Sequence, residues 1–164
     1  MLPMLLFRHI VAFILIKYYK IIYGSKCNFG KKTTFRKNFH LVIAKNGKVV
    51  IGKDCFFNND CSINSLGHIH IGDGCLFGEG VKIYDHNHRF CDFSRSIKEQ
   101  GFSIGTVKIG SCCWIGSNVV LLKGTVIQDH CVIGAGCVIS GHIEKGTIVK
   151  QRDNLDFYKI KEKK

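Results

Sequence analysis

The sequence predicts an all-β protein: a β-solenoid built from six-residue steps, preceded by a short N-terminal helix and opened by one protruding loop. Two observations carry this prediction, a six-residue repeat through most of the chain and a single long interruption of it after residue 88. At 164 residues and 46% apolar content, the chain is long enough for one domain with a buried core and too apolar for disorder.

The first 23 residues are more apolar than the rest of the chain and form the predicted helix. Arg8, Lys17 and Lys20 interrupt them, so no apolar run approaches the roughly 18 residues that span a bilayer. No small-residue cleavage site follows, which argues against a signal peptide and favours the cytoplasm. Two interpretations stay open: a helix packed in an oligomer, or a peripheral helix on the inner face of the membrane with its basic residues toward anionic headgroups.

The predicted β-solenoid covers residues 24–150. From residue 109 the chain reads IGSCCW, IGSNVV, LLKGTV, IQDHCV, IGAGCV and ISGHIE, and the same frame fits from 51, from 71 and more faintly from 23. Slips occur at 41–50 and at 69–71. A helix would repeat its apolar positions every 3.6 residues and a plain strand every two, so a period of six indicates a solenoid.

Each position of the repeat has a predicted role. Positions one and five are expected to point into the core, and the glycine common at position two is expected to permit backbone angles that other residues resist. No CxxC pair occurs, and free cysteine behaves as a small hydrophobe, so the cysteines at position five are interpreted as core residues of a reduced protein. They are Cys27, Cys55, Cys61, Cys75, Cys113, Cys131 and Cys137.

The repeat is interrupted once, after the hexad IYDHNH that starts at residue 83. The following residues, RFCDFSRSIKEQGFSIGTVK, do not keep the frame, which predicts a loop over residues 84–106. A loop of this kind leaves the stack intact, and such loops tend to carry function. His86 and His88 lie where the chain leaves the stack, so a functional site is expected there.

A formal net charge of +12 suggests an anionic partner, either nucleic acid, an acidic membrane surface or a phosphorylated ligand. The basic residues are spread along the chain apart from KIKEKK (159–164), the end of a basic tail at 151–164. No nucleic-acid-binding signature is present, so nucleic acid is not expected as a partner.

Several motifs resemble those of one family: IYDHNHRF (83–90), IKEQGF (97–102), VKIGSCCWIGSNVVLLKGTVI (107–127) and VIGAGCVIS (132–140). They are similar to the hexapeptide-repeat acyltransferases, in particular the branch that O-acetylates capsular, exopolysaccharide or lipopolysaccharide sugars. The resemblance covers roughly residues 50–143. It implies a left-handed parallel β-helix, a homotrimer with active sites between subunits, acetyl-CoA as donor, a sugar or glycan acceptor and no metal.

By this resemblance His88 is the catalytic base. Imidazole ordinarily titrates near pH 6.5 and is suited to remove the proton from a sugar hydroxyl as it attacks the thioester. His86 is expected to bind the acceptor or orient His88, and either Asp85 or Glu99 to hold the imidazole tautomer. Asn87 and Glu99 are the expected acceptor-binding residues. Backbone N–H groups at 114–116 would stabilise the oxyanion.

The same resemblance places Trp114 near the donor, and Ser117, Ala135 and Ser140 along the pantetheine arm of CoA. Members commonly end with a "GNPAK"-like segment, whereas residues 144–160 contain no proline. Lys150 and Arg152 are the candidates for the phosphate contact. Members also often carry Lys after the position of Ser140, where this chain has Gly141.

Three alternative functions stay open. The first is N-acetylation of a nucleotide-linked amino sugar. The second is a zinc-dependent, carbonic-anhydrase-like β-helix, since His68, His70, His86 and His88 recur on neighbouring turns, although the HxxxxH spacing of that group is absent. The third is a scaffold without catalysis.

Overall fold

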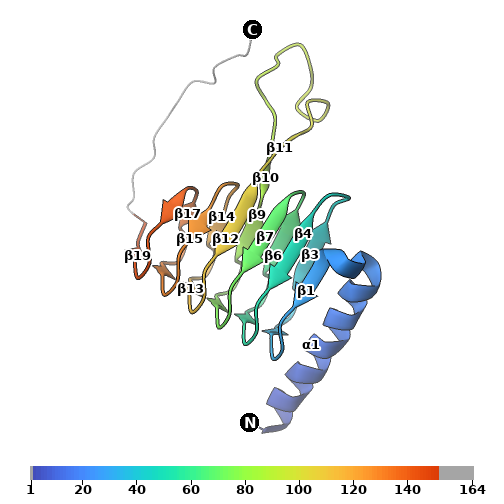
Figure 1. Ribbon diagram of the computed structural model, residues 1–164, viewed down its shortest axis with the longest axis vertical. Coiled ribbons are helices and arrows are strands. Elements are labelled where there is room, and N and C mark those ends of the chain that lie inside the picture. Colours follow the sequence, from blue (N-terminus) through green and yellow to red (C-terminus); the bar gives the residue numbers. More distant parts are fainter. Residues whose placement is uncertain (1, 152–164) are drawn as a thin grey trace.

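The computed structural model describes residues 2–151, with side chains from residue 9 onward, and consists of one helix and a β-solenoid of about six turns. Helix α1 (Leu2–Tyr23) leads through a 3-10 turn (Gly24–Lys26) into three parallel sheets that form the sides of a triangular coil (Figure 1). We call them sheets A, B and C, in the order in which each turn visits them. The β-solenoid predicted from the repeat is confirmed.

The strands are short, and each turn contributes one strand to each sheet, except that the last described turn contributes only to sheets A and B. Sheet A contains β1 (Cys27–Phe29), β4 (Lys48–Ile51), β7 (His68–Ile71), β12 (Thr106–Ile109), β15 (Val126–Ile127) and β18 (His142–Ile143). Sheet B contains β2 (Thr34–Phe35), β5 (Phe56–Phe57), β8 (Leu76–Phe77), β13 (Trp114–Ile115), β16 (Val132–Ile133) and β19 (Ile148–Val149). Sheet C contains β3 (His40–Ile43), β6 (Ser62–Ser65), β9 (Lys82–Tyr84), β14 (Val120–Leu121) and β17 (Val138–Ile139).

Positions one and five of the hexad fill the core, as predicted. Position-one residues such as Ile71, Phe77 and Ile109 are buried at the ends of their strands, and all seven position-five cysteines are buried as free thiols. The Cys75 thiol donates to the carbonyl of Gly110 on the next turn at 3.0 Å. Burial raises the pKa of Cys61 to about 11, because a thiolate would lose its hydration there.

Glycine at position two has a different role from the predicted one. Apart from Gly24 (φ 56°), none of the position-two glycines has a positive φ; instead, a Cβ on Gly72 would lie 2.7 Å from the carbonyl carbon of Gly110, and one on Gly116 would lie 2.6 Å from the nitrogen of Ala135. At Gly72 and Gly116, glycine is therefore needed because successive turns approach closely there. The left-handed conformation occurs at position four instead, for example at Asp54 (φ 55°) and Gly74 (φ 66°).

Helix α1 covers the open N-terminal end of the core (Figure 1). Ala12 and Tyr19 are buried, and the Tyr19 ring lies against Phe29 and Phe39 while its hydroxyl donates to the Phe39 carbonyl at 3.0 Å. The helix thus packs on its own chain rather than only in an oligomer. Within residues 2–151, no helix is both long and apolar enough to cross a membrane.

Every irregularity of the repeat falls at the corner between sheets C and A, the C–A corner. The slip at 41–50 is the turn between β3 and β4, and the slip at 69–71 reflects two extra residues, Leu66 and Gly67, between β6 and β7. The long interruption lies between β9 and β12, where the chain rises away from the coil (Figure 1). The long loop is therefore the largest of three insertions at one corner.

Substitution of Gly72 should destabilise the protein far more than substitution of Gly74. We expect Gly72→Ala to lower the free energy of unfolding by about 1–3 kcal/mol, because the methyl group meets backbone. Gly74→Asn should cost less than about 1 kcal/mol, since the αL conformation is open to Asn and the nearest atom to a Cβ is Cys112 Sγ at 3.6 Å. Urea unfolding at one protein concentration measures both. Equal costs would contradict the close-approach explanation.

Thiol labelling should report the core directly. In the native protein we expect iodoacetamide to modify Cys112, which is exposed, and the half-buried Cys91 more slowly, because reaction requires access to the sulfur. The seven position-five thiols should react only after unfolding, as read by peptide mass spectrometry. Native labelling of several of them at the rate of Cys112 would contradict the packing.

Candidate active site

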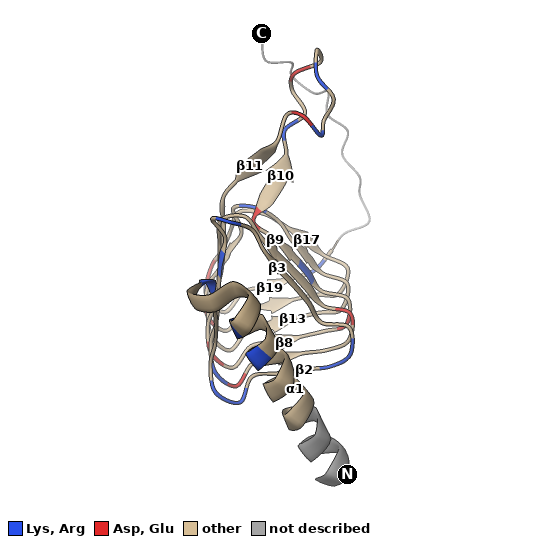
Figure 2. Ribbon diagram, turned by 90° about the vertical axis from the view of Figure 1, so that its right-hand side faces the viewer, with Lys and Arg blue, Asp and Glu red and all other residues tan. Residues whose placement is uncertain are grey.

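A two-stranded antiparallel ribbon carries both predicted histidines away from the coil. Its strands are β10 (His86–His88) and β11 (Phe102–Ile104), with His86 opposite Ile104 and His88 opposite Phe102. Figure 2 shows the ribbon standing on the edge of the solenoid at the C–A corner, with residues 89–101 as its tip. Because successive residues of a strand face opposite sides, His86 and His88, two residues apart, point to the same side of the ribbon, where both rings meet Phe102.

Asp85 fastens this ribbon to the preceding turn. The carboxylate is fully buried and accepts three hydrogen bonds from the 65–67 turn: from Ser65 Oγ at 2.7 Å, Leu66 N at 2.8 Å and Gly67 N at 2.9 Å. Its main-chain carbonyl accepts from Gly105 N at 2.7 Å. Both ends of the ribbon are therefore held at one residue, which is itself bonded to a turn 18–20 residues earlier in the chain.

The structure places Asp85 beside His86 and not beside His88. Nδ1 of His86 lies 3.1 Å from Asp85 Oδ1, and because a carboxylate only accepts, Nδ1 carries the proton. The His86 side chain is 14% exposed, with its ring edge-on to both Tyr84 and Phe102. His86 is thus locked in place, with its tautomer fixed by Asp85.

His88 is the exposed histidine of the pair. Its ring lies against Phe102, with the centroids 4.5 Å apart, and no hydrogen bond joins its nitrogens to any residue that the structure describes. Both nitrogens therefore face solvent or a ligand. His88 lines a hollow of about 680 Å³ at the foot of the loop, formed by Asn87, His88, Arg89, Phe90, Cys91, Asp92, Arg95, Gln100, Ser103 and Lys123.

The tip of the loop is built from its own side-chain hydrogen bonds. Gln100 accepts from Asp92 N at 3.0 Å and donates to the carbonyls of Asp92 and Arg95. Glu99 accepts from Ser96 N and Oγ, which lowers the pKa of its carboxyl group. Glu99 therefore belongs to the tip, and among the described residues it bonds to neither histidine; Asn87, by contrast, does line the hollow.

The predicted donor residues lie mainly at another corner of the coil. Ser117 and Ala135 occupy the same hexad position on successive turns between sheets B and C, joined through the hydrogen bond from Gly136 N to the Ser117 carbonyl at 2.9 Å. Lys150 follows one turn later at this B–C corner and is exposed. Ser140 differs, because it follows β17 at the C–A corner, two turns beyond Tyr84. Arg152 lies outside the described residues.

Trp114 belongs to an apolar row on the outside of sheet B. It is 53% exposed and lies in register between Leu76 and Val132, and the row continues to Ile148. Leu76 and Ile148 are 45% and 64% exposed. Trp114 therefore does not pack in the core at a corner; it presents its ring to the outside, among other apolar side chains.

The structure offers no evident zinc site. Across residues 2–151, no group of three or more His, Cys, Asp or Glu side chains is arranged to hold a metal ion. His68 and His70 lie exposed on β7 of sheet A, with β8 and β9 between that strand and the ribbon, while Nδ1 of His86 is bonded to Asp85.

Sequence reasoning missed most of the residues that form the hollow. Lys123 has the clearest signal, because it occupies the same hexad position as Asp85 one turn later, directly beneath the ribbon. Its ammonium donates to Ser103 Oγ. Arg89 and Gln100 lie within the quoted motifs, but no pattern in the sequence shows that the loop folds back to bring Arg95 and Gln100 over the histidine.

Two relatives match most of the chain. One is named as an acetyltransferase of Mycobacterium tuberculosis and is 35% identical over 120 residues, 73% of this chain. The other is named as a lipopolysaccharide biosynthesis O-acetyl transferase of Escherichia coli and is 29% identical over 129 residues, 74% of this chain. The chain spans 38% of the first relative and 66% of the second, less than two thirds of either.

A solved structure matches the fold in the same region. It is the hexapeptide-repeat-containing acetyltransferase of Vibrio cholerae complexed with acetyl coenzyme A, which aligns with a TM-score of 0.63 and 25% identity over 74% of this chain and 64% of that chain. The bacterial transferase hexapeptide (six repeats) pattern matches residues 106–141, which span the turns from β12 to β17. With its repeat, its coil and these relatives, the chain belongs to the hexapeptide-repeat transferase family.

Proposed function

We propose that this chain is an O-acetyltransferase that moves an acetyl group from acetyl-CoA to a hydroxyl of a sugar in polysaccharide or lipopolysaccharide biosynthesis. The observation that carries the proposal is the exposed imidazole of His88, which lines the hollow formed by the longest insertion at the C–A corner. The names of the two relatives support acetyl transfer, and one of them supports a hydroxyl acceptor. The Vibrio cholerae complex supports acetyl-CoA as donor.

In this proposal His88 is the general base. A ring nitrogen takes the proton of the acceptor hydroxyl while its oxygen attacks the thioester carbonyl, and the resulting oxyanion needs nearby N–H donors. The tetrahedral intermediate then breaks its C–S bond, releasing the acetylated sugar, and the proton passes from the imidazolium to the CoA thiolate. Asn87 and Lys123 line the same hollow and can hydrogen-bond acceptor hydroxyls.

His86 acts as a positioning residue in this scheme. Its Nδ1 is held by Asp85 and its ring is wedged against Phe102, the same ring that supports His88. The pair His86–Asp85 thus fixes the ribbon, and through Phe102 it fixes the orientation of the His88 ring. The Asp85 carboxylate therefore orients the base His88 indirectly, through His86 and Phe102.

We also propose that the active site forms between subunits of a homotrimer. His88 lies at the C–A corner, whereas Ser117, Ala135 and Lys150 lie at the B–C corner of the same chain. A donor held along the second corner of one subunit can reach the histidine of a neighbour. The apolar row of Leu76, Trp114, Val132 and Ile148 supports such contact, because exposed apolar rows of this kind mark interaction surfaces.

Replacing the base should nearly abolish turnover. We expect His88→Ala to lower kcat by about 10²–10⁴-fold, the usual contribution of a general base, with the circular dichroism spectrum and assembly unchanged. The assay follows the free thiol released from acetyl-CoA with a panel of sugar acceptors, including nucleotide-linked amino sugars as the N-acetylation alternative.

Two further variants serve as controls for that experiment. His68→Ala removes an exposed histidine on sheet A and should leave kcat unchanged. His86→Ala should loosen the ribbon, which thermal unfolding would detect. If His86→Ala abolished turnover with an unaltered fold while His88→Ala remained active, His86 would be the base.

Mixing two inactive variants should restore activity if the site is shared between subunits. His88→Ala removes the base, and Ala135→Trp fills the exposed path of the donor arm. Random mixing of the two in a trimer leaves about one quarter of the interfaces with both halves intact, so about one quarter of wild-type activity should return. Light scattering checks the trimer mass. Mixed trimers without recovered activity would contradict a shared site.

A further inference from the structure

The positive charge of the chain is concentrated at the helix-covered end of the coil. Residues 1–53 contain 11 Lys and Arg and no Asp or Glu, which leaves 13 basic and 12 acidic residues for positions 54–164. The basic residues are spread along the chain, as expected, but the acidic ones that balance them begin only at Asp54. Residues 1–53, which form α1, the first turn and the start of the second, therefore carry 11 of the 12 net positive charges.

The outer face of α1 is apolar and uncovered. While Ala12 and Tyr19 face the core, the opposite side carries large apolar residues that are 50–84% exposed: Ile10, Phe13, Ile14, Tyr18, Ile21 and Ile22. Lys17 and Lys20 lie exposed among them, and Lys17 Nζ is 5.4 Å from the centroid of the Phe13 ring. The charged positions coloured on α1 are all basic (Figure 2).

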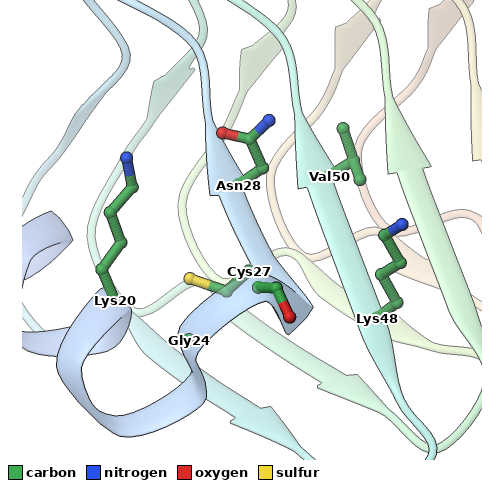
Figure 3. A pocket seen from close by; sticks show the side chains of 7 residues that line it. Lys20, Gly24, Cys27, Asn28, Lys48 and Val50 are labelled. Carbon is green, nitrogen blue, oxygen red and sulfur yellow. The ribbon is translucent and has the colours of Figure 1, made fainter.

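A hollow of about 530 Å³ lies where the end of this helix meets sheet A. It is lined by Lys20, Gly24, Ser25, Cys27, Asn28, Lys48 and Val50. Figure 3 shows Lys20 on the helix and Lys48 on β4, with Asn28 of β1 between the two ribbons. No carboxylate of the described residues pairs with either ammonium group, and Ser25 and Asn28 add polar groups. These groups suit a phosphate rather than a neutral ligand.

We propose that α1 docks this end of the protein on the surface of an anionic phospholipid bilayer. The helix lies in the interface with its uncovered face among the headgroups and upper acyl chains, and the hollow at Lys20 and Lys48 takes a lipid phosphate. A second copy of the chain fits the same face poorly, because pairing would bring two uncompensated basic regions together. The inference goes beyond the proposed acetyl transfer and uses none of its residues.

Apolar burial and charge should contribute separately to this binding. Each Lys near an anionic surface strengthens binding by about fivefold, and salt weakens that part within a Debye length. The exposed isoleucines contribute an apolar part that salt does not weaken. Binding of the whole protein should therefore require anionic lipid and decrease with added salt, without vanishing.

Co-sedimentation of the full chain with vesicles tests the proposal. Wild type should bind vesicles of equimolar phosphatidylglycerol and phosphatidylcholine and bind phosphatidylcholine alone far more weakly. Ile14→Ser/Ile21→Ser should weaken binding by about tenfold or more, because both side chains are mostly exposed and their loss spares the core. Lys17→Gln/Lys20→Gln should weaken binding by about 25-fold.

A charge-matched pair distinguishes docking from general attraction. Lys98→Gln/Lys145→Gln removes the same charge from exposed positions in the tip of the long loop and in the last turn of the coil, away from the helix, and should change binding by less than about twofold. An equal loss in both lysine pairs would overturn the proposal, as would equal binding to the neutral vesicles. A third result would also overturn it: wild type binds no vesicles, and its assembly in the absence of lipid has a larger mass than that of Ile14→Ser/Ile21→Ser. A second copy of the chain would then cover the helix.

Turnover with a soluble sugar separates this inference from the proposed function. Ile14→Ser/Ile21→Ser should keep wild-type kcat in solution while losing vesicle binding. Conversely, loss of turnover in His88→Ala should leave vesicle binding intact.

Discussion

Main-chain hydrogen bonds between successive turns are the constraint on which this molecule depends. Gly72 N donates to the Ile109 carbonyl and Gly110 N to the Ile127 carbonyl, each at 2.8 Å, so each turn is placed by the backbone of its neighbour. Such ladders require every turn to have the same cross-section. The small residues at position two and the identical burial of positions one and five follow from that requirement, and so does the restriction of insertions to a corner.

The long loop illustrates how strictly the ladder is kept. Ile71 pairs with Ile109 across a separation of 38 residues, while Ile109 pairs with Ile127 across only 18. The coil thus closes beneath the loop as if the extra residues were absent. Because the loop starts and ends at one corner, Asp85 can hold both of its ends, and His88 is carried outside the coil without disturbing it.

Residues that interact through the repeat were predictable from sequence, and residues that interact across the insertion were not. The frame predicted the buried Cys61 and Ile109, because their environment recurs on every turn. It did not predict that Asp85 binds the 65–67 turn, since a two-residue slip hides which residues lie beneath it, nor that its imidazole partner is His86. The role of glycine at position two was also misjudged, because the sequence gives no distance between turns.

The fully buried carboxylate of Asp85 divides the insertion into a root that is fixed to the coil and a tip that is not. Its partners all belong to the coil and to the root of the ribbon, whereas residues 89–101 are stabilised mainly by bonds among themselves, such as those of Gln100. Changes in the tip therefore leave the attachment of His88 unaltered. Residues 89–101 can thus be remodelled by selection at little cost to folding.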